Sequence, residues 1–187
     1  MNRWQLAQAA RTIHGGGVIA YPTEAVFGLG CDPLNPDAVQ NLLTLKQRPM
    51  NKGLILIAAD IAQLTPFIAP LTPEAKTQLA HTWPGPHTWL LPARANTPRW
   101  IRGQHDTIAV RVTAHPVAAA LCRAAGHALV STSANPAGKT PAIDTLRVRR
   151  YFPNALDDIL HGALGTETGP TPIRDLATKK LIRPAGS

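Results

Sequence analysis

The sequence of 187 residues predicts one α/β (or α+β) domain over residues 1–187, a twisted mixed sheet flanked by helices. Helical patterns with capping residues alternate with short apolar runs that are typical of buried strands. Hydrophobic residues make up 44% of the chain, which is ordinary for a globular protein. The 18 prolines stand at element boundaries and form no tract, which indicates rigid loops and not a low-complexity linker.

Four segments carry helical patterns. Arg3 to His14 places apolar side chains at helical spacing and ends before three glycines. Asn35-Pro36 and Thr72-Pro73 each combine a capping residue with a proline at the first helical position, and the first of these helices is expected to run to about Leu45. Pro116 to Ala125 is rich in alanine and predicts a further helix.

Apolar runs bounded by turn residues predict buried strands. The main runs are Val18 to Tyr21, Leu54 to Ala59, Trp89 to Leu91, Thr107 to Val112 and Ala128 to Thr132. The C-terminal part alternates shorter extended pieces with Gly and Pro. These pieces are Asp158 to His161, Ile173 to Leu176 and Lys180 to Arg183.

The composition limits the classes of binding partner and the cellular compartment that we expect for the protein. The net charge of +8 favours polyanions such as nucleotide triphosphates, RNA or acidic lipid. Cys31 and Cys122 form no redox or metal pattern and are expected to be small buried hydrophobes. There is no signal-peptide pattern, and no apolar stretch approaches the roughly 20 residues that span a bilayer. We therefore expect a cytoplasmic protein without membrane contact.

Two polar segments follow apolar runs in the first third of the chain, where α/β sheets build their sites. In the first, Thr23 and Glu24 follow a strand, and Gly28 allows close approach of the backbone; a turn before a packed segment explains the pattern equally well. In the second, Lys46, Arg48 and Lys52 lie within seven residues. They would suit a triphosphate, although the first two could simply stabilise a helix C-terminus.

Two more polar segments follow later strands. Arg111 interrupts an apolar run, so its charge must meet either a ligand carboxylate or a structural Asp or Glu. Ser131, Ser133 and Asn135 cluster at a strand end and would suit phosphate and ribose oxygens, or form a capped turn. No GxSxG elbow and no HExxH spacing occurs, which disfavours a hydrolytic nucleophile and a metal cluster.

Together and in this order, these segments resemble the YrdC-like family in its single-domain bacterial form. The matching motifs are Pro-Thr-Glu to Gly-Leu-Gly (22–30), Lys-x-Arg-Pro (46–49), Trp-Pro-Gly-Pro (83–86), Val-Arg-x-x-x-His-Pro (110–116) and Ser-Thr-Ser-Ala-Asn (131–135). Each motif is weak alone, but five in register across almost the whole chain are specific. The resemblance implies a mixed sheet that encloses a deep, positively charged cavity.

The resemblance also implies a reaction. ATP, L-threonine and bicarbonate would give threonylcarbamoyl-AMP and pyrophosphate, which makes the protein a nucleotidyltransferase. Mg²⁺ is expected to be held mainly by the phosphates, with no metal site of the protein's own. The product would pass to a downstream tRNA threonylcarbamoyl transferase complex that modifies adenosine 37 of tRNA. A module that binds double-stranded RNA or tRNA, or a carbamoyl-transfer domain with another donor, remains an alternative.

Roles follow from the resemblance at the matching positions. Implied ATP contacts are Lys46 and Arg48, which are also the catalytic pair, with Lys52, Thr107, Ser133, Asn135 and Arg183. Implied threonine contacts are Thr23, Arg111 on the carboxylate, Ser131 and Thr171. Two departures from the family pattern stand out. Gly53 replaces a usual proline, which predicts a looser turn, and the segment from Thr171 to Asp175 matches only in part.

Overall fold

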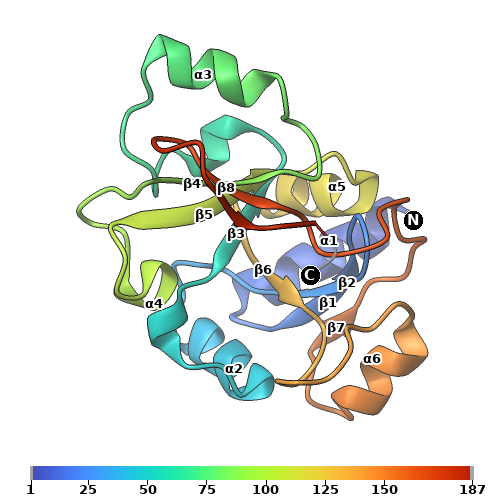
Figure 1. The fold of residues 1–187 in the computed structure, drawn as a ribbon. Coiled ribbons are helices and arrows are strands. Elements are labelled where there is room, and N and C mark those ends of the chain that lie inside the picture. Colours follow the sequence, from blue (N-terminus) through green and yellow to red (C-terminus); the bar gives the residue numbers. More distant parts are fainter. Residues whose placement is uncertain (1, 186–187) are drawn as a thin grey trace.

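The computed structural model describes residues 2–185 and confirms the predicted fold class, a mixed sheet flanked by helices (Figure 1). Within these residues nine strands form the sheet, in the order β7-β1-β2-β6-β3-β5-β4-β8-β9. The strands are β1 (Ile19–Pro22), β2 (Phe27–Gly30), β3 (Ile55–Ala58), β4 (Thr88–Pro92), β5 (Thr107–Val112), β6 (Leu129–Ser133), β7 (Asp158–Ile159), β8 (Ile173–Asp175) and β9 (Leu181–Arg183).

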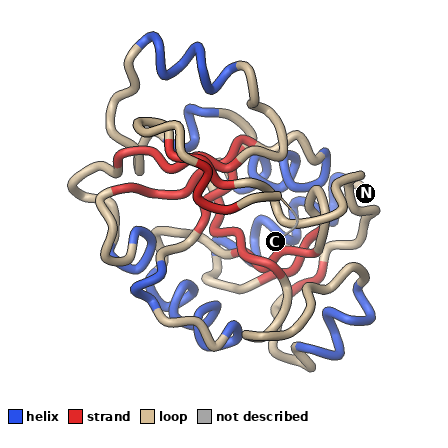
Figure 2. Tube along the Cα trace, in the orientation of Figure 1, coloured by secondary structure: helices blue, strands red, loops and turns tan. Residues whose placement is uncertain are grey.

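The helices lie around the sheet, as the tube in Figure 2 shows. They are α1 (Arg3–His14), α2 (Pro36–Lys46), α3 (Pro73–Ala80), α4 (Arg99–Arg102), α5 (Pro116–Ala125) and α6 (Thr145–Tyr151), with short 3₁₀ turns η1 (Met50–Lys52) and η2 (Ile61–Leu64). The predicted caps are present. The side chain of Asn35 accepts from the first-turn amides of α2, and that of Thr72 accepts from Ala75 N. No helix within residues 2–185 is long and apolar enough to cross a membrane.

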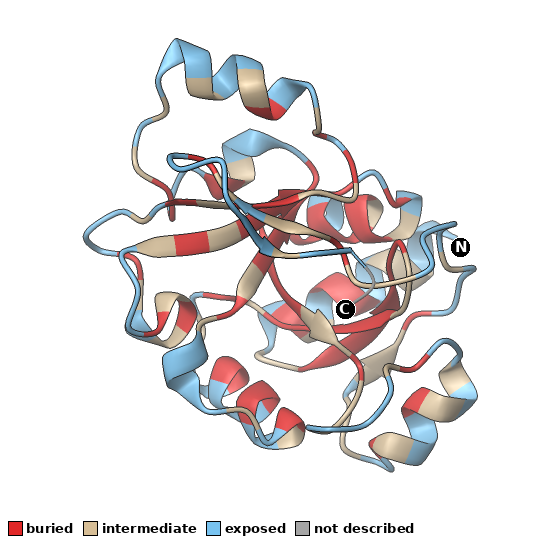
Figure 3. Ribbon diagram, in the orientation of Figure 1, coloured by how far each residue is buried: buried red, intermediate tan, exposed pale blue. Residues whose placement is uncertain are grey.

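Two apolar clusters lie on opposite faces of the sheet because successive strand side chains alternate. On one face, α1 and α5 pack over Ile19, Tyr21 and Ile57. On the other face, α2, α3, α4 and α6 contribute to a larger cluster that includes Leu56 and Val110. Figure 3 shows the buried residues concentrated in the strands and on the inward sides of α2 and α5.

The buried cysteines agree with the sequence prediction. Cys31 and Cys122 are both free and fully buried, one in each cluster. Burial raises the pKa of each thiol to about 12, so both stay protonated at neutral pH. They act as packing residues.

Strand β2 was not predicted from the sequence, because glycine is a poor strand former and occupies half of its four positions. It pairs antiparallel with both β1 and β6, and the hydrogen bonds on both sides compensate for the low strand propensity of its glycines. A side chain at Gly30 would lie 2.8 Å from the ring of Tyr21 and 2.6 Å from Val130 O. The glycine is therefore required by close packing under a buried aromatic ring.

Helix α6 and the short α4 were also missed. Asp144 caps α6 by accepting from Arg147 N at 2.6 Å, but only Val148 of the helix is buried, so its apolar pattern is weak. The helix α4 has only four residues, too few for a periodic signal. Both helices need the tertiary structure to be recognised.

One face of the sheet positions the site. Ile55, Arg111 and Ser131 project from β3, β5 and β6 on the same face as Ile57, which α5 covers. Helices α1 and α5 cover only part of this face. The remainder stays open and forms the floor of a cavity.

Candidate functional site

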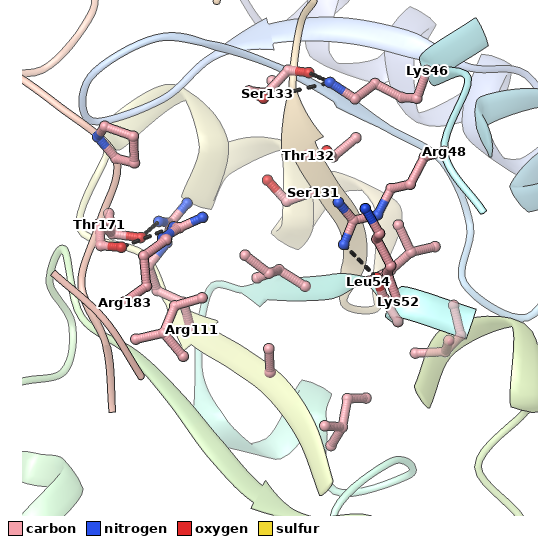
Figure 4. A pocket seen from close by; sticks show the side chains of 18 of the residues that line it. Lys46, Arg48, Lys52, Leu54, Arg111, Ser131, Thr132, Ser133, Thr171 and Arg183 are labelled. Carbon is pink, nitrogen blue, oxygen red and sulfur yellow. Dashed lines mark hydrogen bonds between the residues drawn. The ribbon is translucent and has the colours of Figure 1, made fainter. Parts of the chain in front are cut away.

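A cavity of about 550 Å³ opens on the uncovered part of the sheet (Figure 4). Its walls come from the turn after β1, the loop after α2, the end of α4, strands β5 and β6, and the C-terminal strands β8 and β9. Among the lining residues described, Glu24 is the only carboxylate. The cationic lining side chains are Lys46, Arg48, Lys52, Arg102, Arg111 and Arg183, with His105 nearby. The cavity is therefore strongly electropositive.

All of the site residues expected from the sequence line this single cavity. They are Thr23, Lys46, Arg48, Lys52, Thr107, Arg111, Ser131, Ser133, Asn135, Thr171 and Arg183. In Figure 4 the cations form two groups at opposite ends. We call Lys46, Arg48 and Lys52 the lysine-side group, and Arg111 with Arg183 the arginine-side group.

Lys46 links α2 to the loop that follows β6. Its ammonium donates to Ser133 O at 2.5 Å, to Asn135 O at 2.6 Å and to Asn135 Oδ1 at 3.0 Å. The hydroxyl of Ser133 donates to Asn135 Oδ1 at 2.6 Å. Burial, together with the neighbouring charge of Arg48, lowers the pKa of Lys46 to about 8. An anion bound here would favour the charged form.

Arg48 lies in the loop after α2 and lines the same cavity. Its Nη2 donates to Gly53 O at 2.8 Å, while its buried Nε has no partner. Burial lowers the pKa of this guanidinium, which remains charged at neutral pH. Lys52 is exposed at the rim, on η1. The lysine-side group thus combines a hydrogen-bonded ammonium (Lys46), a guanidinium with free donors (Arg48) and an exposed cation at the rim (Lys52).

The turn at Gly53 is not loose, contrary to the sequence prediction. Gly53 has φ +65°, which proline cannot adopt, and its N–H donates to Met50 O at 3.2 Å. The backbone of Arg102 packs against Gly53, and a side chain at Gly103 would lie 2.4 Å from Asn51 O. Gly53 and Gly103 therefore let the backbone of this turn pack directly against the end of α4, where a larger side chain would not fit.

The arginine-side group is anchored on Thr171. Arg111 Nη1 donates to Thr171 Oγ1 at 2.9 Å, and Arg183 Nη2 donates to Thr171 O at 2.8 Å. Thr171 also shares a hydrogen bond of 3.1 Å with Thr88. Arg111 forms an ion pair of 3.3 Å with Glu24, so the structural acid left open by the sequence is present. Burial, and then the charges of Arg111 and Arg48, lower the pKa of Arg183.

The remaining predicted residues supply hydroxyls to the lining. Ser131 is buried on the floor between the two groups, and Thr107 lies at the start of β5 (Figure 4 labels Ser131). Thr23 Oγ1 donates to Val26 O at 2.7 Å, so this hydroxyl is already engaged within its own turn. Sequence reasoning assigned no role to Glu24 or Arg102. Glu24 could have been found from its place beside Thr23, but Arg102 is marked by no motif.

This arrangement can hold a large anion and a small one side by side. Neither a paired carboxylate nor a group of three or more metal-ligating side chains occurs among the residues described. The fold and the site together define an α/β protein with an electropositive cavity whose cations suit anionic ligands.

The chain belongs to the Sua5/YciO/YrdC family, described as "Telomere recombination", whose model matches residues 11–185. A threonylcarbamoyl-AMP synthase of Nitrosococcus oceani is 59% identical over 180 residues, which cover 96% of this chain and 97% of that protein. The resemblance inferred from the five motifs is thereby confirmed.

Solved structures share the fold. Pyrococcal Sua5 ("P. abyssi Sua5 complexed with L-threonine") has a TM-score of 0.92 and 32% identity, covering 100% of this chain and 55% of that chain. The present chain therefore spans just over half of that longer protein. E. coli YciO has a TM-score of 0.87 and 28% identity, and the match covers 100% of this chain and 92% of the YciO chain.

Proposed function

We propose that this protein synthesises threonylcarbamoyl-AMP from ATP, L-threonine and bicarbonate. The observation that carries the proposal is the cavity itself, which places two separate cation groups on either side of Ser131. One group suits a triphosphate and the other suits the carboxylate of an amino acid. The synthase name of a relative 59% identical over nearly the whole chain supports the same reaction.

The lysine-side group would bind ATP. Lys46 and Arg48 would neutralise the phosphates, with Lys52 closing on them from the rim. Ser133 and Asn135 hold Lys46 in place and would add neutral contacts to the nucleotide. Thr107 would complete the nucleotide contacts together with Arg183, which belongs to the arginine-side group but would face the nucleotide. These are charge-assisted interactions that strengthen as negative charge moves toward the leaving pyrophosphate.

The arginine-side group would bind threonine. Arg111 retains donors beyond those used for Thr171 and Glu24, and its buried Nε has no partner. Its free N–H groups would hold the substrate carboxylate, while Thr23, Ser131 and Thr171 would surround the rest of the amino acid. This placement would leave the substrate amine near the centre of the cavity.

The chemical step needs positioning more than a strong base. The threonine amine takes up the carbon of bicarbonate as a carbamate, with loss of water. One carbamate oxygen then bonds to the α-phosphorus of ATP, while the bond from that phosphorus to the bridging oxygen breaks and pyrophosphate leaves with the electron pair. The attacking oxygen is already anionic, so the cavity must mainly reduce repulsion between two anions.

Mg²⁺ would enter as part of the Mg–ATP substrate. Glu24 faces Thr113 and Arg111, so the described lining offers the ion no free carboxylate. Phosphate oxygens and water are the ligands that Mg²⁺ keeps in such sites. The product would be delivered to a tRNA threonylcarbamoyl transferase complex acting on adenosine 37.

The alternative, a module that binds double-stranded RNA or tRNA, has the net charge of +8 in its favour. However, Lys46 and Arg111 are each only 6% exposed, out of reach of the phosphates of a duplex. The deciding experiment is pyrophosphate release from ATP, with threonine and bicarbonate omitted in turn. Release that requires both supports the synthase. Release indifferent to threonine, alongside salt-sensitive RNA binding, would favour the RNA module.

A further inference from the structure

Glu24 is a buried acid that the proposed mechanism does not use. It is 6% exposed and follows Thr23 in the turn after β1. It is the one carboxylate in the described lining of a cavity that contains six Lys and Arg side chains. Removing a carboxylate from water is costly unless charge and hydrogen bonds compensate, so its surroundings must supply both.

The surroundings of Glu24 form one continuous polar chain. Thr113 Oγ1 donates to Glu24 Oε1 at 2.6 Å, and the same Oγ1 accepts from His115 N at 3.1 Å. Glu24 Oε2 has no hydrogen-bond partner but lies 3.3 Å from Arg111 Nη2. Arg111 in turn donates to Thr171, at 2.9 Å. Glu24 is thus held on one side by a hydroxyl and on the other side faces the guanidinium.

The two guanidinium groups of the arginine-side group need this acid. Arg111 and Arg183 both bond to Thr171, and the charge of Arg111 contributes to the lowered pKa of Arg183. Two like charges this close repel each other when no anion is bound. Thr171 fixes one nitrogen of Arg111 but supplies no charge, so among residues 2–185 Glu24 alone forms an ion pair with Arg111.

We propose, on the basis of the proposed function, that Glu24 is the positioning residue for the amino-acid substrate. It holds the guanidinium of Arg111 so that the free N–H groups face the cavity before threonine arrives. It also limits the net charge at this end, which favours a zwitterionic amino acid over a second phosphate group. The described lining around the lysine-side group contains no such acid, so the two ends of the cavity would differ in which anion they prefer.

The test compares Glu24→Gln with a matched control, Glu74→Gln, an exposed acid of the first turn of α3. Pyrophosphate release gives KM for threonine and for ATP. We expect Glu24→Gln to raise the threonine KM at least ten-fold and to change the ATP KM less than two-fold. Equal rises in both, or an unchanged threonine KM, would overturn the proposal. The control should match the wild type in both constants.

A second readout separates positioning from general destabilisation. L-Threoninamide lacks the carboxylate, so the wild type should bind it far more weakly than L-threonine in calorimetry. Glu24→Gln should shrink this discrimination several-fold, whereas a loss of folded protein would reduce both bindings together. Because calorimetry needs no turnover, it also tests Glu24 should the wild type release no pyrophosphate, which is the failure of the proposed function.

A third variant covers the case in which Glu24→Gln does not fold. Thr113→Val removes the 2.6 Å hydrogen bond and keeps the carboxylate charge. We expect Thr113→Val to raise the threonine KM selectively, but less than Glu24→Gln does. Glu24→Asp, which keeps the carboxylate, should have a threonine KM between those of the wild type and Glu24→Gln. A rise in the ATP KM of equal size in Thr113→Val would contradict the proposal.

Discussion

Raising the pH from 7 to 9.5 should weaken ATP binding by the wild-type protein, because Lys46 loses its proton in this range. Burial and the nearby Arg48 lower the pKa of Lys46 to about 8 in the ligand-free cavity. If ATP binds only the charged form, its Kd rises about ten-fold at pH 9 and about thirty-fold at pH 9.5, or about 2 kcal/mol. Mg–ATP, the titrant used below, is fully ionised at pH 7 and does not titrate in this range.

Calorimetric titration with Mg–ATP, without threonine, at pH 7, 8, 9 and 9.5 measures this effect directly. At pH 9 binding should also take up about one proton, which appears as a difference in heat between buffers of different ionisation enthalpy. Lys46→Arg keeps its charge throughout and should show a flat Kd. Lys52→Ala, at the exposed rim, should bind more weakly but keep the pH slope.

Two results would refute this reasoning. One is a wild-type Kd that stays constant from pH 7 to 9.5. The other is a slope of equal size in Lys46→Arg, because the titrating group would then be elsewhere. A constant Kd would mean that the pKa of Lys46 is not lowered in the free protein or that its ammonium does not contact the phosphates, and an equal slope in Lys46→Arg would assign the titration to another group.

The same pKa shift has a consequence for stability. The pKa of Lys46 is lower in the folded protein than in the unfolded chain, so between about pH 8 and 10.5 the unfolded chain binds more protons. The contribution of Lys46 to the free energy of unfolding should therefore rise with pH across this window, by up to about 3 kcal/mol. The raised thiol pKa of Cys31 and of Cys122 acts in the opposite direction above pH 9, so the effect of Lys46 is the difference between the wild type and Lys46→Arg. The gain should be absent from Lys46→Arg when the two proteins are compared by urea unfolding at each pH.

Arg48→Ala should abolish pyrophosphate release while its thermal unfolding stays near that of the wild type, and normal turnover would remove Arg48 from the phosphate site. Leu56→Ala, fully buried in β3, should lower the free energy of unfolding by about 2–5 kcal/mol in urea and leave the KM values unchanged. Gly103→Ala should raise the ATP KM, because its Cβ would lie 2.4 Å from Asn51 O and displace the turn that carries Lys52; Gly126→Ala, also at positive φ but in open space, should not. L-Serine should react about 10–200-fold less efficiently than L-threonine, since one methyl group supplies about 1–3 kcal/mol, and equal efficiency would argue against an apolar contact with that methyl.

Much of the fold could be predicted because its signals are local. Asn35 and Thr72 cap helices through amides two or three residues away, so the sequence contains both partners. Apolar runs such as Leu54 to Ala59 mark central strands whatever their neighbours are. Strand β2 escaped because its glycines are explained by close neighbours on β1 and β6, which include the ring of Tyr21 and the carbonyl oxygen of Val130.

The candidate site, too, has features that the sequence predicts and features that only the tertiary structure shows. The motifs and the family resemblance identified many of the polar residues that line the cavity, because most of the motifs stand at the end of a strand or helix that could be predicted, but they assigned no role to Glu24 or Arg102. The partners of those residues came only from the tertiary structure. Lys46 meets Ser133 across 87 positions, and Glu24 meets Thr113 across 89. Such contacts depend on the order and register of the strands between them, which no local pattern specifies. The sequence therefore indicated most of the cations of the site, and the packing of the sheet brought in Glu24 and decided which cation it balances and which cations are left for a substrate.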